Sequence, residues 1–305
     1  MQPSLSIPLI VIAALLTDRL LGEPARLHPL SGFGAVAKFV EQRLYRNSRI
    51  FGVLSLLIAV LPFVSLAWAL PEDGWFGALI SVFVLYFAIA PRSLVEHARR
   101  VADDFARGDL SAARRSVGRI VSRDTASLDE AGVARATVES VLENGNDAIF
   151  GALFWFVIAG LPGVVLYRLC NTLDAMWGYR NARYNEFGWA AARLDDLLNY
   201  VPARLTAFSY GLIGNVGCAL RCWREQAPLW DSPNAGPVMA AGAGALRVRL
   251  GGAASYGGRL EPRPVLGCGR DATRADIERA VQLVLRTLYL WTFAICVVAL
   301  AVSHA

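Results

Sequence analysis

Lysine, histidine and recognisable nucleophile motifs are scarce in this chain of 305 residues, and each scarcity excludes a class of chemistry. Lys38 is the only lysine, and the surrounding Gly34–Phe39 stretch does not form the G-x-x-x-x-G-K-[ST] loop that cradles nucleotide phosphates. If the protein handles phosphate, arginine must therefore supply most of the positive charge. With three histidines and neither a G-x-S-x-G nor an H-E-x-x-H motif, a catalytic triad is also an unfavourable interpretation.

The five cysteines form no C-x-x-C pair, and their odd number argues against a framework of disulfides. Cys218 and Cys222 are spaced to share one face of a helix, which leaves a structural zinc or redox role open, but no histidine lies near them in sequence. We favour the interpretation that all five are buried small apolar residues. They are Cys170, Cys218, Cys222, Cys268 and Cys296.

Charge is also low for a soluble protein. Charged residues make up 18% of the chain and apolar residues 55%, against roughly 25% and 45–50% in soluble domains. The mean hydropathy of +0.42 agrees. The net charge of +5 does not indicate nucleic acid, because the arginines form no stripe between stacking aromatic residues. The composition predicts a membrane protein in contact with the lipid bilayer.

We predict an all-α polytopic membrane protein that forms a single domain over 1–305. We expect four full spans, near 5–21, 51–70, 75–90 and 283–302. Two further apolar segments, 148–169 and 205–220, contain breaks, at Gly160–Gly163 in the first and at Ser209 and Asn215 in the second. We predict that each of these two is a membrane-associated segment that is re-entrant or a hairpin.

Charge around the first spans predicts the orientation. The segment 18–50 carries six basic residues against three acidic ones, while the turn at 71–74 carries two acids and no base. The positive-inside rule therefore places 18–50 in the cytoplasm and the turn outside. We expect the large polar regions 91–147, 171–204 and 221–282 to be cytoplasmic and both termini to lie outside the inner membrane.

Acidic residues repeat along one predicted helix, from Leu128 to Asp147, which Ser127 and Glu130 would cap in a capping-box pattern. Glu139, Glu143 and Asp147 are four residues apart, so they share a face and repel one another. A solvated acidic face is one interpretation. Because the helix runs directly into an apolar segment, a Mg²⁺ site at the bilayer edge is the other.

Two further polar blocks follow. The first, 171–204, is dense in acids, amides, arginines and aromatic residues, and single Tyr and Trp residues there are best interpreted as interfacial anchors. The second, 232–270, is rich in glycine and lacks regular periodicity. No G-x-G-x-x-G follows a strand there, so a dinucleotide-binding interpretation fails; loops that cradle an anion and plain turns both stay open.

The polar motifs together resemble those of the CobD/CbiB family, the membrane-bound adenosylcobinamide-phosphate synthases of cobalamin biosynthesis. The resemblance covers almost the whole chain, in order and at family-like spacing. It is carried by Asp18–Pro24 with His28–Pro29, Ser122–Thr125, Val138–Asp147, Asn171–Asp174, Gly178–Tyr184, Phe187–Gly188, Arg193–Arg204 and Ser232–Gly236. Glu23 stands where the family usually has Asp, and Leu142 and Gly145–Asn146 also depart from the commoner pattern.

This resemblance implies an ATP-dependent amide ligation that joins adenosylcobyric acid to aminopropanol phosphate or a related amino alcohol. ATP and Mg²⁺ would be the cofactors, because a carboxylate must be activated before an amine can attack it. The metal ligands would be Glu139, Glu143 and Asp147, and Asp174, Asp195 or Asp196 would act in catalysis, with Asp174 or Asp195 as proton acceptor. Phosphate clamps would be Arg123, Arg183 and Arg204, and the other substrate-binding residues Asp18, Glu23, His28, Asp124, Thr125, Asn171, Tyr184, Asn199, Ser232 and Asn234.

Two other functions stay open. A transporter for a corrinoid or another anionic solute could also use broken helices and buried carboxylates, but the halves of the chain show no similarity to each other. A scaffold without catalysis is opposed by the density of acids, amides and arginines near the predicted bilayer. A homo-oligomer, or association with other membrane enzymes of cobalamin assembly, is compatible with either enzyme or transporter.

Overall fold

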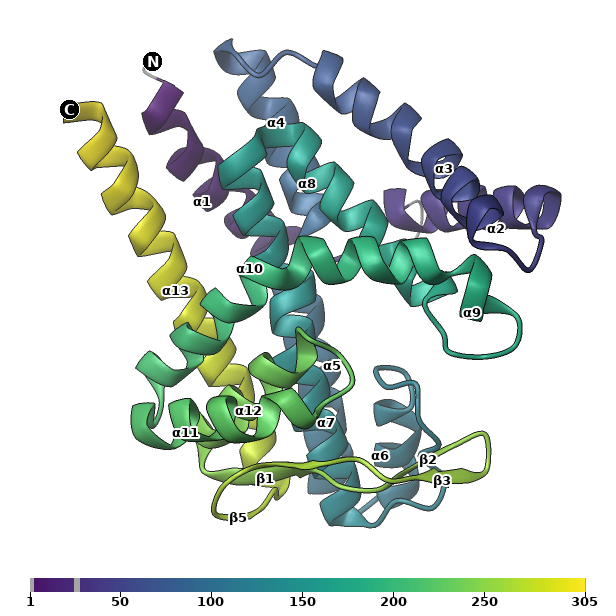
Figure 1. Cartoon of the computed structure of the whole chain (residues 1–305). Coiled ribbons are helices and arrows are strands. Elements are labelled where there is room, and N and C mark those ends of the chain that lie inside the picture. Colours follow the sequence, from purple (N-terminus) through teal and green to yellow (C-terminus); the bar gives the residue numbers. More distant parts are fainter. Residues whose placement is uncertain (1–2, 25–27, 305) are drawn as a thin grey trace. The chain divides into compact units, whose positions relative to one another are not determined.

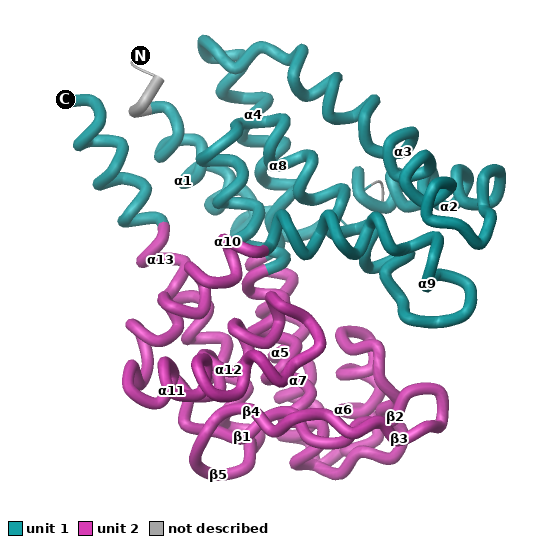
Figure 2. Tube along the Cα trace, viewed as in Figure 1, with its two compact units in different colours: residues 1–90, 147–199, 292–305 teal, residues 91–146, 200–291 magenta. Residues whose placement is uncertain are grey.

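The computed structural model describes residues 3–24 and 28–304, and the chain divides into two compact units (Figure 2). Unit 1 consists of residues 1–90, 147–199 and 292–305, and unit 2 of residues 91–146 and 200–291. Residues 25–27, which belong to the motif between Gly22 and Pro29, lie outside the described part. Each unit is therefore assembled from segments that are distant in sequence.

Unit 1 is helical (Figure 1). Within it α4 packs against α1 and α8, and α3 packs against α2, α8 and α9. The long helices are strongly apolar, which is the composition that predicted the spans. The helices are α1 (Pro3–Leu21), α2 (Pro29–Leu44), α3 (Arg49–Ala69), α4 (Gly74–Ala88), α8 (Gly151–Trp177), α9 (Tyr184–Phe187), the first part of α10 (Trp189–Ile213) and the last part of α13 (Arg274–His304).

Helix α8 turns back on itself at the predicted break. Ala159 and Gly160 leave the helical conformation, and Gly160 has φ +58° and ψ −146°. As a result, the Tyr167 hydroxyl lies 3.1 Å from the carbonyl oxygen of Asp147, 20 residues away, whereas a straight helix would separate them by about 30 Å. The prediction of a hairpin in 148–169 is confirmed.

The hairpin extends along the whole length of α4. At its base the Ala90 amide donates to the Ala148 carbonyl (3.0 Å), and at its apex the Leu161 amide donates to Glu72 Oε1 (3.3 Å). The first arm therefore accompanies α4 from one end to the other, because Glu72 and Ala90 flank that helix. The second arm returns to the level of Asp147. The polar block 171–204, which follows this arm along the chain, therefore begins near that residue.

Four helices in the described residues are long and apolar enough to cross a membrane: Arg49–Ala69, Gly74–Ala106, Glu130–Trp177 and Arg274–His304. Three of these contain the predicted spans 51–70, 75–90 and 283–302. The predicted span 5–21 forms α1 but is not one of the four. The fourth, Glu130–Trp177, contains the hairpin, so it is not one straight crossing. The chain is an all-α polytopic membrane protein in its main architecture.

Unit 2 holds the polar helices and a small sheet. Helices α5, α6 and α7 pack together, and α12 packs against α7, α11 and strands β1 and β4. Helix α5 ends shortly before Gly108, which has φ +74°. The helices are α5 (Pro91–Ala106), α6 (Leu110–Val117), α7 (Glu130–Gly145), the last part of α10, α11 (Val216–Gln226), α12 (Ala235–Leu246) and the first part of α13.

The acidic helix differs from its prediction at both ends. Asp129, not Ser127, caps α7, and its carboxylate accepts a hydrogen bond from the Gly132 amide (2.7 Å). At the other end a π-helix, Asn146–Phe150, follows α7 directly. Asp147 therefore lies in a π-helical turn rather than in α7 itself.

The second predicted hairpin is broken at Gly214–Asn215, where α10 ends and the Asn215 side chain caps α11 by accepting from the Cys218 amide (2.9 Å). Its second arm is amphipathic and carries Arg221 and Arg224. A break in 205–220 was predicted, but α11 extends beyond it as a polar helix rather than as a membrane segment.

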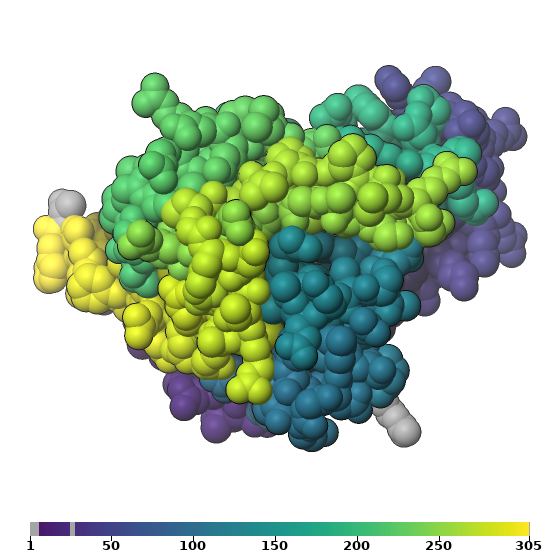
Figure 3. All heavy atoms as spheres, turned by 90° about the horizontal axis from the view of Figure 1, so that it is seen from below, coloured from purple at the N-terminus to yellow at the C-terminus, as the bar shows by residue number. Residues whose placement is uncertain are grey.

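The glycine-rich block is more regular than predicted. It contains α12 and five short strands, β1 (Val248–Gly251), β2 (Ala254–Tyr256), β3 (Arg259–Glu261), β4 (Val265–Gly267) and β5 (Arg270–Asp271). The order β4-β1-β5 is antiparallel and then parallel, with Leu250 opposite Leu266. Gly257 and Gly258 both have positive φ, as a two-residue hairpin between β2 and β3 requires. Figure 3 shows this yellow-green segment as a band across the surface of unit 2.

Candidate functional site

The densest polar cluster in unit 1 lies where the second arm of α8 meets the start of α10. We call it the Asp195 cluster, and its residues come from the π-helix, α8 and α10. They contact one another through side-chain amides, a hydroxyl, a guanidinium, the Asp195 carboxylate and the backbone carbonyl of Asp147. The members are Asp147, Tyr167, Arg168, Asn171, Asp195 and Asn199.

Two amide side chains hold the Asp195 carboxylate. Asn171 Nδ2 donates to Oδ1 (3.2 Å), and Asn199 Nδ2 lies 3.1 Å from both Oδ1 and Oδ2. Asn199, which is buried, accepts in turn from the Tyr167 hydroxyl at 3.0 Å. Asp195 and Asn199 are four residues apart on α10, so they lie on one face of that helix, and Asn171 joins them from α8.

The pKa of the Asp195 carboxyl group is raised toward neutral pH. Burial, together with the negative charge of Asp147, raises the pKa of Asp195 to about 7. The two amide donors act in the opposite direction but do not cancel the effect of burial. A carboxylate with this pKa can accept a proton near physiological pH and release it again.

Arg168 brings the positive charge of this cluster, and it is not among the site residues predicted from the sequence motifs. Its Nη1 donates to Asn171 Oδ1 (3.2 Å) and to the Asp147 carbonyl (3.3 Å). Its Nε is buried and has no hydrogen-bond partner among the described residues. The sequence does contain an indication of its role, because an arginine in the apolar run 148–169 is itself a reason to suspect a functional site.

In unit 1 an apolar cavity beside Arg168 has a volume of about 210 Å³. A larger cavity, of about 380 Å³, lies in unit 2 and is lined by polar and charged residues. The walls of the cavity in unit 1 come from α2, α3, α4 and α8, and Arg168 is its only charged lining residue. Such a cavity would accept an apolar group that carries one anionic substituent.

The N-terminal motif lies beside the same arginine. His28 caps α2 by accepting from the Leu30 amide at Nδ1 (3.2 Å), and burial lowers the pKa of its imidazole. Glu23 and Arg168 both lie within electrostatic reach of His28. The Gly22 carbonyl accepts from Tyr86 (2.6 Å), which fixes the start of the loop, and Asp18 is buried near the end of α1.

The two other predicted catalytic carboxylates also lie near Asp195. Asp174 is half-buried and its side chain lies against Gly178, where a Cβ would approach Asp174 Oδ1 to 2.0 Å. Asp196 lies 3.5 Å from Arg193 in an i, i+3 ion pair, and burial raises its pKa. Asp195 differs from them in accepting hydrogen bonds from two side-chain amides, Asn171 and Asn199.

Arg183 and Tyr184 form a separate cluster around Glu41. Arg183 donates to Glu41 Oε1 through Nε (3.0 Å) and Nη2 (2.7 Å), and the Tyr184 hydroxyl donates to the same oxygen (2.9 Å). The Arg183 guanidinium also stacks on Tyr45, 4.3 Å from the ring centre. The structure therefore gives Arg183 a carboxylate partner in the protein, and its predicted role as a phosphate clamp stays a prediction.

In unit 2, Glu139 is neutralised by two arginines. Its Oε2 accepts from Arg123 and from Arg263 (2.9 Å), while Oε1 accepts from the Gly251 amide (2.7 Å). Glu139 is 2% exposed, and Arg263 stacks over Trp230. In this structure Glu139 and Arg123 are ion-pair partners of each other, and their predicted roles as metal ligand and phosphate clamp stay predictions.

Asp124 fixes the β2–β3 hairpin. Its Oδ2 accepts from Ser255 Oγ (2.9 Å) and from the Gly258 amide (2.8 Å), and the backbone donor lowers the pKa of this carboxyl. Thr125 Oγ1 would lie 3.0 Å from a Cβ at Gly118. These contacts give Asp124 a structural partner inside unit 2.

Arg204, Asn234 and Ser232, three predicted substrate-binding residues, contact one another in unit 2. Arg204 Nη1 donates to Asn234 Oδ1 (2.9 Å), and Nη2 donates to the Pro233 carbonyl (3.0 Å). Ser232 Oγ accepts from the Ala235 amide (3.1 Å) at the start of α12. The Ser232–Asn234 motif is therefore attached to α10 through one guanidinium, 3.5 Å above the Tyr200 ring centre.

The three predicted metal ligands differ in their surroundings. Glu139 is neutralised, Glu143 is half-buried on α7, and Asp147 belongs to unit 1 with the Asp195 cluster. Among the described residues, three metal-ligating side chains gather at one place, and those are Cys218, Cys222 and Cys268. Arg263, from the connection between β3 and β4, is a partner of Glu139 that no local spacing indicated, and the metal site on the three carboxylates stays a prediction.

Known proteins match this chain along most of its length. The family model described as CobD/Cbib protein matches residues 11–284. Each of the following relatives is a "Cobalamin biosynthesis protein CobD". The protein of Stutzerimonas stutzeri is 60% identical over 294 residues, 94% of this chain and 96% of the relative. That of Chromobacterium violaceum is 58% identical over 287 residues, 91% and 92% of the two chains. That of Mycobacterium tuberculosis is 43% identical over 281 residues, 90% of each chain.

No solved structure matches significantly. The family therefore rests on the sequence comparisons, and these agree with the order of the polar motifs along both units. Because the family model covers far more than half of the chain and the relatives cover nearly all of it, the chain belongs to the CobD/CbiB family of cobalamin biosynthesis proteins.

Proposed function

We propose that this protein is an adenosylcobinamide-phosphate synthase, a ligase that uses ATP to join adenosylcobyric acid to aminopropanol phosphate or a related amino alcohol. A free carboxylate does not react with an amine at a useful rate, so the acid must first be activated, most simply as an acyl phosphate. The amine then attacks the acyl carbon, phosphate leaves and the nitrogen loses a proton. The site must therefore hold anions and accept a proton.

The Asp195 cluster carries this proposal. Asp195, with a pKa of about 7, is the proposed acceptor of the proton from the attacking ammonium. Asn171 and Asn199 would orient its carboxylate, because each donates to it. Asp174 and Asp196 stay as alternative acceptors nearby.

Arg168 is the proposed anion-binding residue of unit 1. Its unpartnered Nε could complete its hydrogen bonding on a substrate carboxylate or phosphate. The neighbouring apolar cavity would accept an apolar edge of the corrinoid. In unit 2 we propose the Arg204–Asn234–Ser232 group as a second polar contact for phosphate.

ATP and Mg²⁺ are proposed cofactors. The donor set around Glu139 does not fit a metal, because two guanidiniums already neutralise that carboxylate. Asp147 fits better, since it lies within electrostatic reach of Asp195 and carboxylate oxygen is the ligand that Mg²⁺ prefers. Magnesium bound with ATP would neutralise negative charge on the phosphates.

The membrane character is plain from the long apolar helices. We further propose that the membrane is the inner membrane and that the polar regions face the cytoplasm, where ATP is available. A homo-oligomer, or contact with other membrane enzymes that supply the corrinoid, is part of the same proposal.

Asp195→Asn tests the role of the proton acceptor. It keeps the shape of the side chain but removes its basicity, so amide formation by purified protein should fall by about 10²–10⁴-fold. Asp103→Asn, at an exposed carboxylate on α5, is the matched control and should retain activity. An Asp195→Asn enzyme with an unchanged rate would contradict the assignment. Corrinoid uptake into proteoliposomes without any amide product would favour a transporter.

A further inference from the structure

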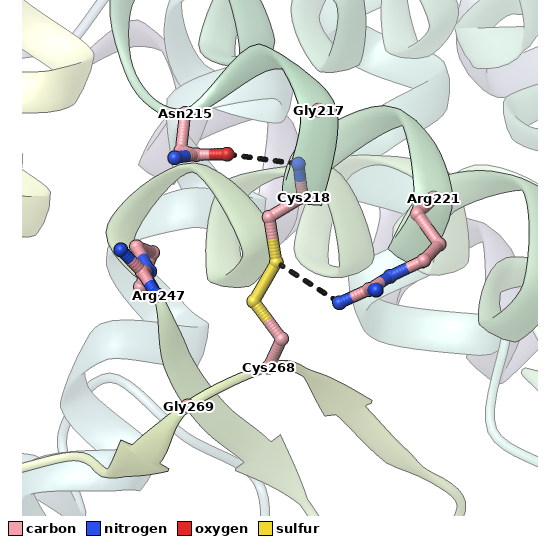
Figure 4. Close-up of a pocket in the computed structure, with 7 residues that line it drawn as sticks. All are labelled: Asn215, Gly217, Cys218, Arg221, Arg247, Cys268 and Gly269. Atoms are coloured by element: carbon pink, nitrogen blue, oxygen red, sulfur yellow. Dashed lines mark hydrogen bonds between the residues drawn. A yellow bond between two sulfur atoms is a disulfide. The ribbon is translucent and has the colours of Figure 1, made fainter.

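Three cysteines converge in unit 2, and none of them is among the residues of the proposed reaction. Figure 4 shows Cys218 on α11 joined by a disulfide to Cys268, which lies between β4 and β5. Cys222, one helical turn after Cys218, is buried with its Sγ 3.9 Å from Cys218 Sγ. The three sulfur atoms all lie within 4.8 Å of one another. The expectation of five unrelated buried cysteines is thus wrong for these three.

The surrounding backbone is built to bring them together. A Cβ at Gly244 of α12 would lie 2.7 Å from the Cys218 carbonyl oxygen, so glycine allows α11 to approach α12 at this point. On the other side, Gln226 of α11 accepts from the Gly267 amide (2.6 Å) and donates to the Gly267 carbonyl (3.0 Å). These two bonds attach the strand that precedes Cys268 to the helix that carries the other two cysteines.

The spacing suits a metal ion held by thiolates. Tetrahedral zinc with Zn–S bonds of about 2.3 Å separates its sulfur ligands by about 3.8 Å. Cys218 and Cys222 have this separation, and Cys218 and Cys268 have Cα atoms 6.9 Å apart, at the outer limit of roughly 4.4–6.8 Å usual for disulfides. Reduction would leave three thiols facing one another across a distance that one ion can bridge.

We propose that in the reduced protein Cys218, Cys222 and Cys268 bind a soft divalent metal, with Zn²⁺ as the expected ion. A low-molecular-weight thiol reduces the disulfide, so that two of its molecules form their own disulfide and leave Cys218 and Cys268 as thiols. Binding of Zn²⁺ to the three thiols then releases three protons and gives a centre with a net charge of −1.

The neighbourhood provides charge and space for such a centre. Arg221 Nη2 lies 3.9 Å from Cys218 Sγ, and Arg247 lines the same cavity. Their positive charges oppose the net negative charge of a zinc ion with three thiolates. The cavity, about 380 Å³ in volume, leaves room for water as the fourth ligand. The ion would connect α11 to the sheet across 50 residues of chain, as the disulfide does in its absence.

Metal binding is tested on the purified full chain after reduction and removal of the reductant without oxygen. Titration with Co²⁺ should give thiolate-to-cobalt charge-transfer absorption, and Zn²⁺ in competition with a chromophoric chelator should bind one equivalent. Cys222→Ser should weaken Zn²⁺ binding by at least about 100-fold, more than the loss of an outer-shell contact. Cys296→Ser is the control, because Cys296 lies on α13 outside the three-cysteine group, and it should bind as the unaltered chain does.

Alkylation of the unaltered chain gives a readout that needs no variant. Zn²⁺ should protect Cys218, Cys222 and Cys268 from a maleimide while leaving the reactivity of Cys296 unchanged, as peptide mass spectrometry can show. No charge-transfer absorption and no zinc-dependent protection in fully reduced, folded protein would overturn the proposal. Reoxidation to a Cys218–Cys268 disulfide in the presence of excess Zn²⁺ would do so as well.

Discussion

Asp195 and Arg168 bring a carboxyl group and a guanidinium from two different helices into one polar cluster. Asp195 is enclosed by two amides, and its pKa rises to about 7 because burial opposes its charge. Arg168 enters the same cluster from the return arm of the hairpin, with an apolar cavity at its side. A base and a cation thus lie within one cluster, which is what an amide-forming reaction between charged substrates needs.

The pKa of Asp195 predicts the pH dependence of the proposed reaction. A group with a pKa of about 7 is mostly protonated at pH 6 and mostly ionised at pH 8. Since the base must be ionised to accept a proton, the rate at saturating substrate should rise about tenfold over this interval. Residual activity of Asp195→Asn should lack this rise. A pH-independent rate in the unaltered enzyme would contradict the role of Asp195.

The contacts of Glu139 predict a loss of stability rather than a loss of metal. Glu139→Gln leaves Arg123 and Arg263 buried without their counter-ion, so the free energy of unfolding should fall by about 3–5 kcal/mol. Denaturant unfolding of the protein in detergent measures this change. Glu261→Gln, at an exposed position of β3, should leave the midpoint unchanged. An inactive Glu139→Gln variant of normal stability would instead restore the metal-ligand hypothesis.

At the scale of single residues, polar pairs within one helix were predictable and partners from distant segments were not. Asp195 and Asn199 are adjacent on a helix surface, so their spacing alone indicated contact. Glu41 and Arg263 have no local pattern that connects them to Arg183 and Glu139. Only the folded chain shows that these arginines are already neutralised.

Among the secondary-structure elements, the α8 hairpin contributes most to the Asp195 cluster, because its return arm brings Asn171 to Asp195. The reversal depends on Gly160, whose φ of +58° is strained for any residue with a side chain. Glu72, from the turn between α3 and α4, accepts from the Leu161 amide at the apex. The Gly160–Gly163 motif was sufficient to predict the reversal. It did not predict the length of the two arms, which follows from the packing along α4 and from the contact with Glu72.

Gly160→Ala should therefore destabilise unit 1. The added Cβ would lie 2.8 Å from Glu72 Oε1 in a backbone conformation that costs about 1–3 kcal/mol. We expect a lower yield of folded protein and a lower melting temperature by fluorescence-detected size exclusion. Gly32→Ala is the control, because nothing lies within 4 Å of that Cβ on α2. Equal melting temperatures for the two variants would contradict the importance of the reversal.

Unit 2 contains the elements that the sequence pattern did not predict. Alanine and glycine in α12 give no hydrophobic periodicity, because the helix is buried along its whole length. The five strands have at most four residues each, too short for an alternating pattern to stand out. The paired glycines at Gly257–Gly258 were visible, and in hindsight they mark a hairpin turn.

At the scale of the whole molecule, the predicted site residues divide between the two units. Unit 1 contains the Asp195 cluster with Glu23, His28 and Asp147, while unit 2 contains the Glu139 ion pairs and the Arg204–Asn234 group. The predicted single pocket that draws on both units stays a prediction. Composition was enough to predict the membrane class, and the motifs were enough to predict the family.

The most direct measurement is the product itself. Purified protein in nanodiscs would be incubated with adenosylcobyric acid, aminopropanol phosphate, ATP and Mg²⁺, and the corrinoids analysed by mass spectrometry. We predict adenosylcobinamide phosphate in equal amount to the ATP consumed, and none when ATP is omitted. Unchanged adenosylcobyric acid and ATP in the presence of folded protein would contradict the ligase assignment.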